Sequence, residues 1–259
     1  MNPRPVSRVG LLFLIGLLAA CSTPAATPSP TATATLTVAA TPEATEPPGV
    51  PIESAPAAEP CSAGDLCTGL LAPGEYTTDA VGDTTLTLTV DEEWEAEELP
   101  DAGTIALYPV PDDTRSGIAA FRFTGNVFPD PCDIETTEAV EATPEAMIAW
   151  LSAHPELEVG EPEEATLGEA TGLRVEVTAA KAEDCPQDQP IPPDWILLWE
   201  LPAVGDFHFN DGEDAVVYAL QLGEDLFIVL AESVDDPDAF LPMAQPVIDS
   251  MRFAPESAP

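Results

Sequence analysis

The strongest constraint on the fold is a pair of apolar runs near the C-terminal end of the chain, at residues 215–222 and 226–232. Each run has the length of one strand, and only the polar segment Gly223-Glu224-Asp225 separates them, as in an antiparallel hairpin. Residues 84–90 alternate threonine with leucine or valine, the pattern of a strand that buries one face. Sheet therefore dominates the predicted fold, with further strands expected at residues 103–110, 117–124, 172–178 and 195–201.

Two segments have the sequence signals of helices. In residues 143–154, Thr143 can cap the first turn, Pro144 suits the first helical position, and apolar residues fall on one face. Residues 235–251 also place apolar side chains at helical spacing, but two internal prolines predict a kink. Few helices among many strands, without regular alternation, predict an α+β fold in which a few α-helices cover an antiparallel β-sheet.

The first 21 residues have the features of an export signal. Two arginines precede the apolar run at residues 9–18, which is too short to span a bilayer but suits the hydrophobic region of a secretory signal. The run ends in Leu18-Ala19-Ala20-Cys21, which resembles the lipobox of bacterial lipoproteins. We therefore expect residues 1–20 to be a cleaved lipoprotein signal peptide. Cys21 is then the acylated N-terminus of an exported protein, lipid-anchored to the cell membrane and facing the extracytoplasmic side. The alternative is an ordinary signal peptide followed by an incidental cysteine.

Composition divides the rest of the chain in two. Residues 21–60 are rich in Pro, Thr and Ala and contain no aromatic or basic residue, so they cannot form a core and are predicted to be a disordered linker. Extended at about 3.1 Å per residue, such a linker reaches on the order of 100 Å. Because aromatic and periodic apolar residues return after this linker, we expect residues 61–254 to form a single globular domain and residues 255–259 a C-terminal tail.

Four cysteines remain once Cys21 is assigned to the lipid. Cys61, Cys67, Cys132 and Cys185 are an even number in an oxidising compartment, which favours disulfides. Of the three pairings we favour Cys61 with Cys67, which closes a small loop at the start of the domain, and Cys132 with Cys185, which both lie beside proline in polar segments. A thiol nucleophile or metal–thiolate site is the alternative, but no Cys-x-x-Cys spacing supports it.

Acidic residues dominate the charge of the chain. There are 7 Lys plus Arg against 47 Asp plus Glu, which gives a formal net charge of −40. A nucleic acid is excluded as a partner, because its phosphates need Lys and Arg to release their counterions. The plainest role of the acidity is to keep an exported surface hydrated. The alternative is recognition of a cationic partner, which a localised acidic cleft would favour.

Two acidic loops offer the hard oxygen ligands that Ca²⁺ prefers. Neither loop follows the EF-hand spacing, so a hairpin turn and a helix N-terminus are the simpler explanations. We expect no resident cofactor, with Ca²⁺ at these loops as the alternative. The residues concerned are Asp211, Glu213 and Asp214 in the first loop and Asp235, Asp236 and Asp238 in the second.

Sequence signatures of enzymes are scarce. The chain has no Gly-x-Ser-x-Gly elbow, phosphate-binding loop, dinucleotide fingerprint or His-Glu-x-x-His motif. His154 ends the first predicted helix and His208 alternates with phenylalanines, so structural roles are expected for both. A pair of carboxylates could hydrolyse a glycoside, but only burial could separate an acid of raised pKa from the many solvated ones.

Several short segments together resemble a family. They are Gly74-Glu75-Tyr76-Thr77-Thr78, Trp94, Trp150-Leu151 with His154-Pro155-Glu156-Leu157, Leu167-Gly168, Gly172-Leu173 with Val175 and Val177, and Phe240 with Val247-Ile248-Asp249-Ser250-Met251-Arg252-Phe253. This set is similar to uncharacterised bacterial lipoproteins with a PsbP-like domain. The resemblance implies an antiparallel sheet covered by helices and a non-catalytic binding or accessory role. It transfers no catalytic or ligand-binding residue to this chain.

The expected function is that of a membrane-anchored extracytoplasmic lipoprotein, a non-catalytic binding or scaffold module for an extracytoplasmic protein or a small molecule. One alternative is a carrier of a small molecule or lipid, which needs a deep apolar pocket. Another is a hydrolytic enzyme that uses carboxylates, which needs a cleft with convergent polar groups.

The lipid anchor gives a direct prediction. Cys21→Ser removes the acylated thiol, so this variant should leave the membrane fraction or fail to mature. Fractionation of cells followed by immunoblotting measures both effects. A Cys21→Ser protein that is correctly processed and still needs detergent for extraction contradicts the lipoprotein assignment.

Overall fold

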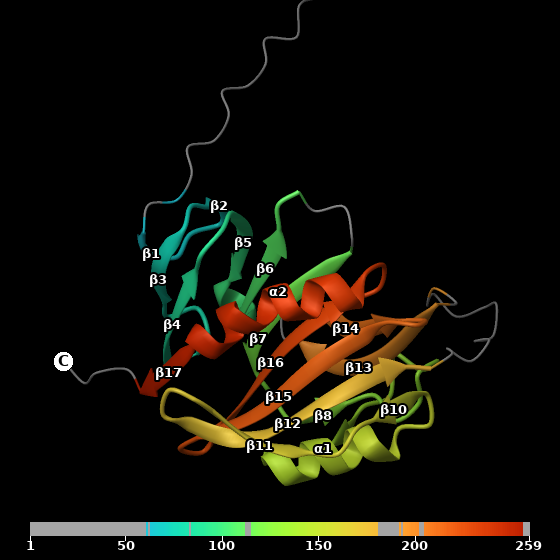
Figure 1. Cartoon of the computed structure of the whole chain (residues 1–259). Helices are drawn as coiled ribbons and strands as arrows, with labels where there is room; N and C mark the ends of the chain where they lie inside the picture. The colour runs from blue at the N-terminus through green and yellow to red at the C-terminus, as the bar shows by residue number, and fades with distance from the viewer. Residues whose placement is uncertain are drawn as a thin grey trace, which may run out of the picture. The chain divides into compact units, whose positions relative to one another are not determined.

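The computed structural model describes residues 61, 63–82, 84–111, 115–180, 192, 194–201 and 205–255. The predicted signal peptide, the predicted linker and most of the predicted C-terminal tail lie outside these residues. The described part of the chain folds into three β-sheets and two α-helices, with one short 3₁₀ helix at Pro100–Ala102 (Figure 1).

The largest sheet has nine strands. Eight follow one another in the order β10-β12-β15-β16-β7-β6-β5-β2, and β11 pairs with β12 beside β10. All of these pairings are antiparallel. The strands are β2 (Gly69–Leu71), β5 (Trp94–Leu99), β6 (Thr104–Pro109), β7 (Ser116–Arg122), β10 (Leu157–Val159), β11 (Glu163–Leu167), β12 (Ala170–Ala179), β15 (Asp214–Leu222) and β16 (Asp225–Ser233).

The hairpin β15–β16 forms the middle of this sheet, and both of its faces are buried. Six consecutive residues are buried in each strand. Val216, Tyr218 and Leu220 of β15 belong to one hydrophobic cluster. The alternate residues Val217 and Ala219 belong to a second cluster, because successive side chains of a strand point to opposite faces. The domain therefore has two cores, one on each face of the large sheet.

A second sheet and helix α2 (Pro237–Ser250) cover the first face. Its core contains Leu86 and Leu88 of the second sheet together with Phe240 and Val247 of α2. Asp236 caps α2, and its side chain accepts from the Ala239 N–H. The second sheet has the order β1-β3-β4-β17, with β1 (Gly64–Asp65), β3 (Gly74–Thr78), β4 (Thr84–Val90) and β17 (Arg252–Pro255).

A third sheet and helix α1 (Pro144–Ala153) cover the opposite face. Trp199 and Phe209 of this sheet pack in the second core with Met147 and Leu151 of α1. Thr143 caps α1, and its hydroxyl accepts from the Ala146 N–H at 3.3 Å. The third sheet has the order β14-β13-β8-β9, with β8 (Asn126–Val127), β9 (Glu138–Ala139), β13 (Trp195–Leu201) and β14 (Gly205–Asn210).

The predicted fold class, α+β with an antiparallel sheet covered by a few helices, is wrong. Strands make up 54% and helices 15% of the structure, which is a β-rich sandwich of three sheets. Two helices of 10 and 14 residues are too short to cover nine strands on both faces. Sheets fill the remaining area on each face, because the apolar sides of the central strands must be shielded from water.

The expected local elements were mostly found. The two-residue loop Gly223–Glu224 joins β15 and β16 with Leu222 opposite Asp225, which confirms the predicted hairpin. In β4 the leucines are buried, as the alternation predicted. Helix α2 contains Pro242 and Pro246 and continues through both to Ser250.

Gly172 allows β12 to lie close to β15. A Cβ atom at this position would overlap the carbonyl oxygen of Ala219 and lie 3.0 Å from the Leu220 Cα. These are backbone atoms in the middle of the sheet, so the overlap cannot be relieved by rotating a side chain.

Gly172→Ala should therefore destabilise the domain by about 1–3 kcal/mol, the range for overpacking a tight site. Gly160→Ala is the matched control, because its nearest contact would be the Glu176 carbonyl oxygen at 3.4 Å, and it should change stability by less than about 0.5 kcal/mol. Denaturant unfolding of both variants measures the difference. Equal stabilities would show that the β12–β15 contact is not tight.

Candidate functional site

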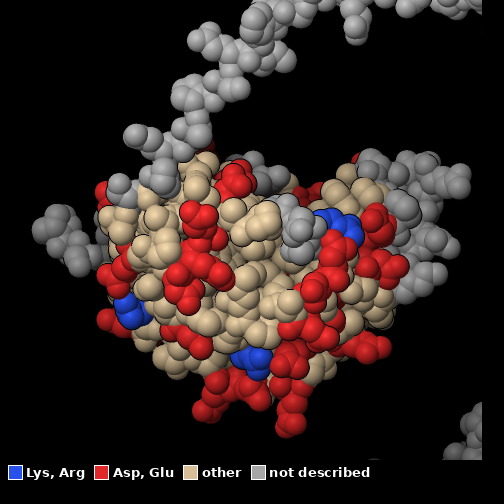
Figure 2. Space-filling view, turned by 45° about the horizontal axis from the view of Figure 1, so that its top comes forward, with Lys and Arg blue, Asp and Glu red and all other residues tan. Residues whose placement is uncertain are grey.

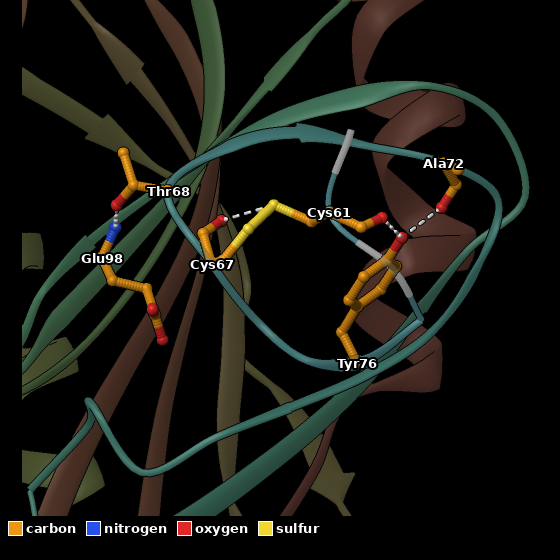
Figure 3. Close-up of a disulfide and its surroundings, with 6 residues drawn as sticks. All are labelled: Cys61, Cys67, Thr68, Ala72, Tyr76 and Glu98. Carbon is orange, nitrogen blue, oxygen red and sulfur yellow. Dashed lines mark hydrogen bonds between the residues drawn. A yellow bond between two sulfur atoms is a disulfide. The ribbon is translucent and has the colours of Figure 1, made fainter. Parts of the chain in front are cut away.

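A disulfide joins Cys61 and Cys67 at the start of the described domain (Figure 3), as the sequence predicted. Their Cα atoms are 6.1 Å apart. Nearby, the buried Tyr76 hydroxyl donates to the Ala72 carbonyl oxygen at 2.6 Å and lies 3.3 Å from the Cys61 carbonyl oxygen. The two contacts hold the disulfide loop against β3, so the role of this disulfide is structural.

The other cysteines are only partly described. Cys132 is also disulfide-bonded. Cys185, its predicted partner, and Cys21, the predicted lipidation site, both lie outside the described residues.

The first calcium candidate loop does not converge on one point. Asp211 is exposed, and the Asp214 carboxylate accepts from the Thr178 hydroxyl at 2.5 Å. Glu213 is only 2% exposed, and its side chain turns inward. The three carboxylates therefore have three different surroundings.

The second calcium candidate loop is the N-terminus of α2. Asp235 pairs with Arg115 at 3.3 Å, Asp236 caps the helix, and Asp238 is exposed in its first turn. Across the described residues, no group of three or more His, Cys, Asp or Glu side chains could hold a metal ion.

Burial does select one pair of carboxyl groups, Glu213 and Glu232. Their side chains share a hydrogen bond, and the second oxygen of Glu232, Oε2, is fully enclosed. Burial raises the pKa of both groups, and the charge of Glu213 raises the pKa of Glu232 further. The Asn210 backbone N–H and side-chain amide donate to Glu213 at 2.7 and 2.8 Å, which stabilises that carboxylate. The shared proton is therefore held by Glu232.

The two histidines differ in burial and in their contacts: His154 is buried and His208 is half-buried. His154, at the C-terminal end of α1, packs edge-on against Trp150, and its Nδ1 accepts from the Glu156 N–H at 3.4 Å. His208 in β14 stacks on Trp195 with ring centroids 3.5 Å apart. Burial lowers the pKa of both imidazoles, that of His154 to about 4.

A groove with a volume of about 820 Å³ lies beside α1. Three structures form its walls: the N-terminal turn of α1, the hairpin β11–β12 and the loop between β15 and β16. Four of the lining residues are exposed glutamates, and none is Lys or Arg. They are Glu141, Glu145, Glu164 and Glu224. We call this the α1 groove.

A second acidic groove lies on the other face of the same hairpin. Its volume is about 470 Å³, and it is lined by Glu163, Arg174, Tyr218, Gln245 and Asp249 as well as by β11 itself. Because Gln245 and Asp249 come from α2, we call it the α2 groove. The two grooves share Glu164, Ala165 and Thr166 of β11.

Basic side chains neutralise few of the acidic side chains on the described surface. All four arginines of the described residues form ion pairs with carboxylates: Arg115 with Asp235, Arg122 with Asp225, Arg174 with Glu163 and Glu176, and Arg252 with Glu75. Figure 2 shows acidic side chains spread over one face among few basic ones. The glutamates of the α1 groove come from three segments that are far apart in the chain, so no short motif marks the groove in the sequence.

Two further grooves are smaller. One of about 380 Å³ lies between β12 and α2 and includes Arg174 and Asp214. Another, of about 220 Å³, is lined mainly by apolar residues, among them Val110, Phe240 and Met243. Neither histidine, and neither member of the pair Glu213–Glu232, lines any of these four grooves.

Neither a protein-family model nor a curated protein sequence matches the chain. Among the described helices, none has the length and apolar character needed to cross a bilayer.

The buried imidazole of His154 predicts a loss of stability in acid. Its pKa is about 4 in the fold and about 6.5 in the unfolded chain, so only the unfolded state gains a proton between these values. Above pH 6.5 the imidazole is neutral in both states, so its contribution to the free energy of unfolding does not vary with pH. As the pH falls toward 4, protonation of the unfolded state lowers the free energy of unfolding by up to about 3 kcal/mol.

His154→Gln removes this proton site. Relative to the native protein, the variant should become progressively more stable as the pH falls from 7 to 4, when unfolding is followed with denaturant at each pH. A stability difference between the two proteins that does not vary with pH contradicts the buried, neutral state of His154.

Proposed function

We propose that this protein is a lipid-anchored extracytoplasmic binding module that holds a cationic partner in the α1 groove, without catalysing a reaction. The observation that carries the proposal is the charge of the groove, which four glutamates line without a basic residue. Clefts lined by one sign of charge focus the field and concentrate ligands of the opposite sign.

The position of the four glutamates suits recognition. Glu141, Glu145, Glu164 and Glu224 are exposed, so their side chains are accessible to a partner. They come from the start of α1, from β11 and from the β15–β16 loop. Helix α1 and strand β11 both contact β15, and the loop joins the two central strands. A rigid frame of this kind lowers the entropy lost on binding.

Export and lipidation are the second part of the proposal. They rest on the signal-like segment before Cys21 and on the composition of residues 21–60. A long linker would let the acidic module meet partners well away from the membrane surface.

The two alternative functions find less support. A carrier needs a deep apolar pocket of about 300 Å³ or more, whereas the mainly apolar groove here has about 220 Å³. An acid–base hydrolase needs its carboxyl pair beside its substrate, whereas Glu213 and Glu232 line none of the four grooves.

The proposal is tested with a hexalysine peptide as the probe. Replacing the four groove glutamates by glutamine, in the protein purified from membranes, should weaken binding by about tenfold. Exposed ion pairs contribute roughly 0.2–1 kcal/mol each, and about 1.4 kcal/mol corresponds to tenfold in affinity. Isothermal titration calorimetry at low salt measures the effect.

A matched control removes the same charge elsewhere. Glu92, Glu93, Glu95 and Glu97 are exposed on or just before β5, far along the nine-stranded sheet from β12. Their replacement by glutamine should change the affinity by less than about threefold, because distant charges are screened. Equal losses of affinity in the two variants would show that only the net charge of the protein matters. That result would overturn the α1 groove as the binding site.

A further inference from the structure

Strand β11 is an edge strand between the two acidic grooves. Within the described residues it pairs with β12 alone, from Glu163 opposite Arg174 to Leu167 opposite Ala170. An edge strand presents one row of unpaired backbone N–H and C=O groups, which another chain can use to add a strand.

The register shows which backbone groups face outward. Leu167 and Ala170 close the hairpin around the two-residue loop Gly168–Glu169, and such a closing pair is hydrogen-bonded. Hydrogen-bonded and non-bonded pairs alternate along an antiparallel ladder. The N–H and C=O groups of Glu164 and Thr166 therefore point away from β12, toward the free edge.

The side chains of β11 point alternately into the two grooves. Leu167 is buried in the core on the α2 side, so Ala165 and Glu163 share that side. Glu164 and Thr166 then face α1, as does Leu173 opposite Glu164, which packs against the second core. A strand added beside β11 would extend this alternation and place successive side chains over the α1 groove and the α2 groove.

The grooves differ in charge. The α1 groove has four glutamates and no cation. In the α2 groove, Glu163 is paired with Arg174 at 3.0 Å, and the remaining lining includes the uncharged Tyr218 and Gln245 beside Asp249. The α1 groove therefore favours a positively charged side chain much more strongly than the α2 groove does.

We propose that an extended basic peptide segment of a partner adds to β11 as a further strand, with Lys or Arg at every second position over the α1 groove and small polar residues over the α2 groove. This inference rests on the proposed function, since it specifies the cationic partner of the same groove. Backbone hydrogen bonds at Glu164 and Thr166 supply the docking, and charge complementarity selects the segment.

The test separates backbone pairing from charge. Thr166→Pro removes the outward N–H of residue 166 and leaves every groove glutamate in place, and proline is tolerated on an edge strand when its nitrogen faces outward. Thr166→Val is the matched control, because it keeps the N–H. The probe is an eight-residue peptide of alternating Lys and Thr, titrated into the protein purified from membranes.

We expect Thr166→Pro to weaken binding of this peptide by at least about tenfold, a loss equivalent to about 1.4 kcal/mol. Thr166→Val should change the affinity by less than about twofold. If Thr166→Pro binds as tightly as Thr166→Val while the glutamine variant of the α1 groove binds weakly, strand addition is overturned and the proposed function stands. If no variant changes the affinity, both fail.

A second measurement does not depend on the proline variant. Amide hydrogen exchange of the native protein, with and without the peptide, reports the individual backbone groups. The Glu164 and Thr166 amides should exchange at least about tenfold more slowly with the peptide bound, whereas the Ala165 amide, already paired with β12, should change little. Unchanged exchange at Glu164 and Thr166 under saturating peptide overturns strand addition, and the charges of this edge then serve only to prevent aggregation.

Discussion

The structure depends on the burial of both faces of the hairpin β15–β16. Six consecutive residues in each strand are out of water, and alternate side chains enter separate cores. No single covering layer can shield such a pair of strands. A sheet with a helix therefore packs on each face, and the close approach of β12 to β15 at Gly172 continues the central sheet toward its β11 edge.

Because the cores take up the apolar residues, most acidic residues are left to the surface, and only a few of the described polar side chains are buried. Glu213 and Glu232 share a hydrogen bond between the β14–β15 turn and β16. His154 remains neutral at the end of α1, because burial lowers the pKa of its imidazole. Both features lie at chain turns, and neither lines any of the four grooves described above.

The candidate site occupies the place where the central sheet stops. Within the described residues, β12 pairs on its outer side with the short strands β10 and β11 alone, so an edge remains open between α1 and α2. The capped first turn of α1 and the β15–β16 loop project acidic side chains beside this edge. Unpaired backbone groups and acidic side chains without basic partners therefore lie beside one another, although the residues involved are far apart in the sequence.

Local patterns in the sequence determined the β15–β16 hairpin, the capped start of α1, the extent of α2 and the Cys61–Cys67 disulfide. Each depends on residues close together in the chain, whose periodicity or spacing reports burial directly. The sandwich of three sheets, the pairing of β11 at an edge and the convergence of Glu141, Glu164 and Glu224 were decided by tertiary structure alone. Periodicity shows that a face is buried but not which layer covers it, and charge along a chain does not show which turns will lie side by side.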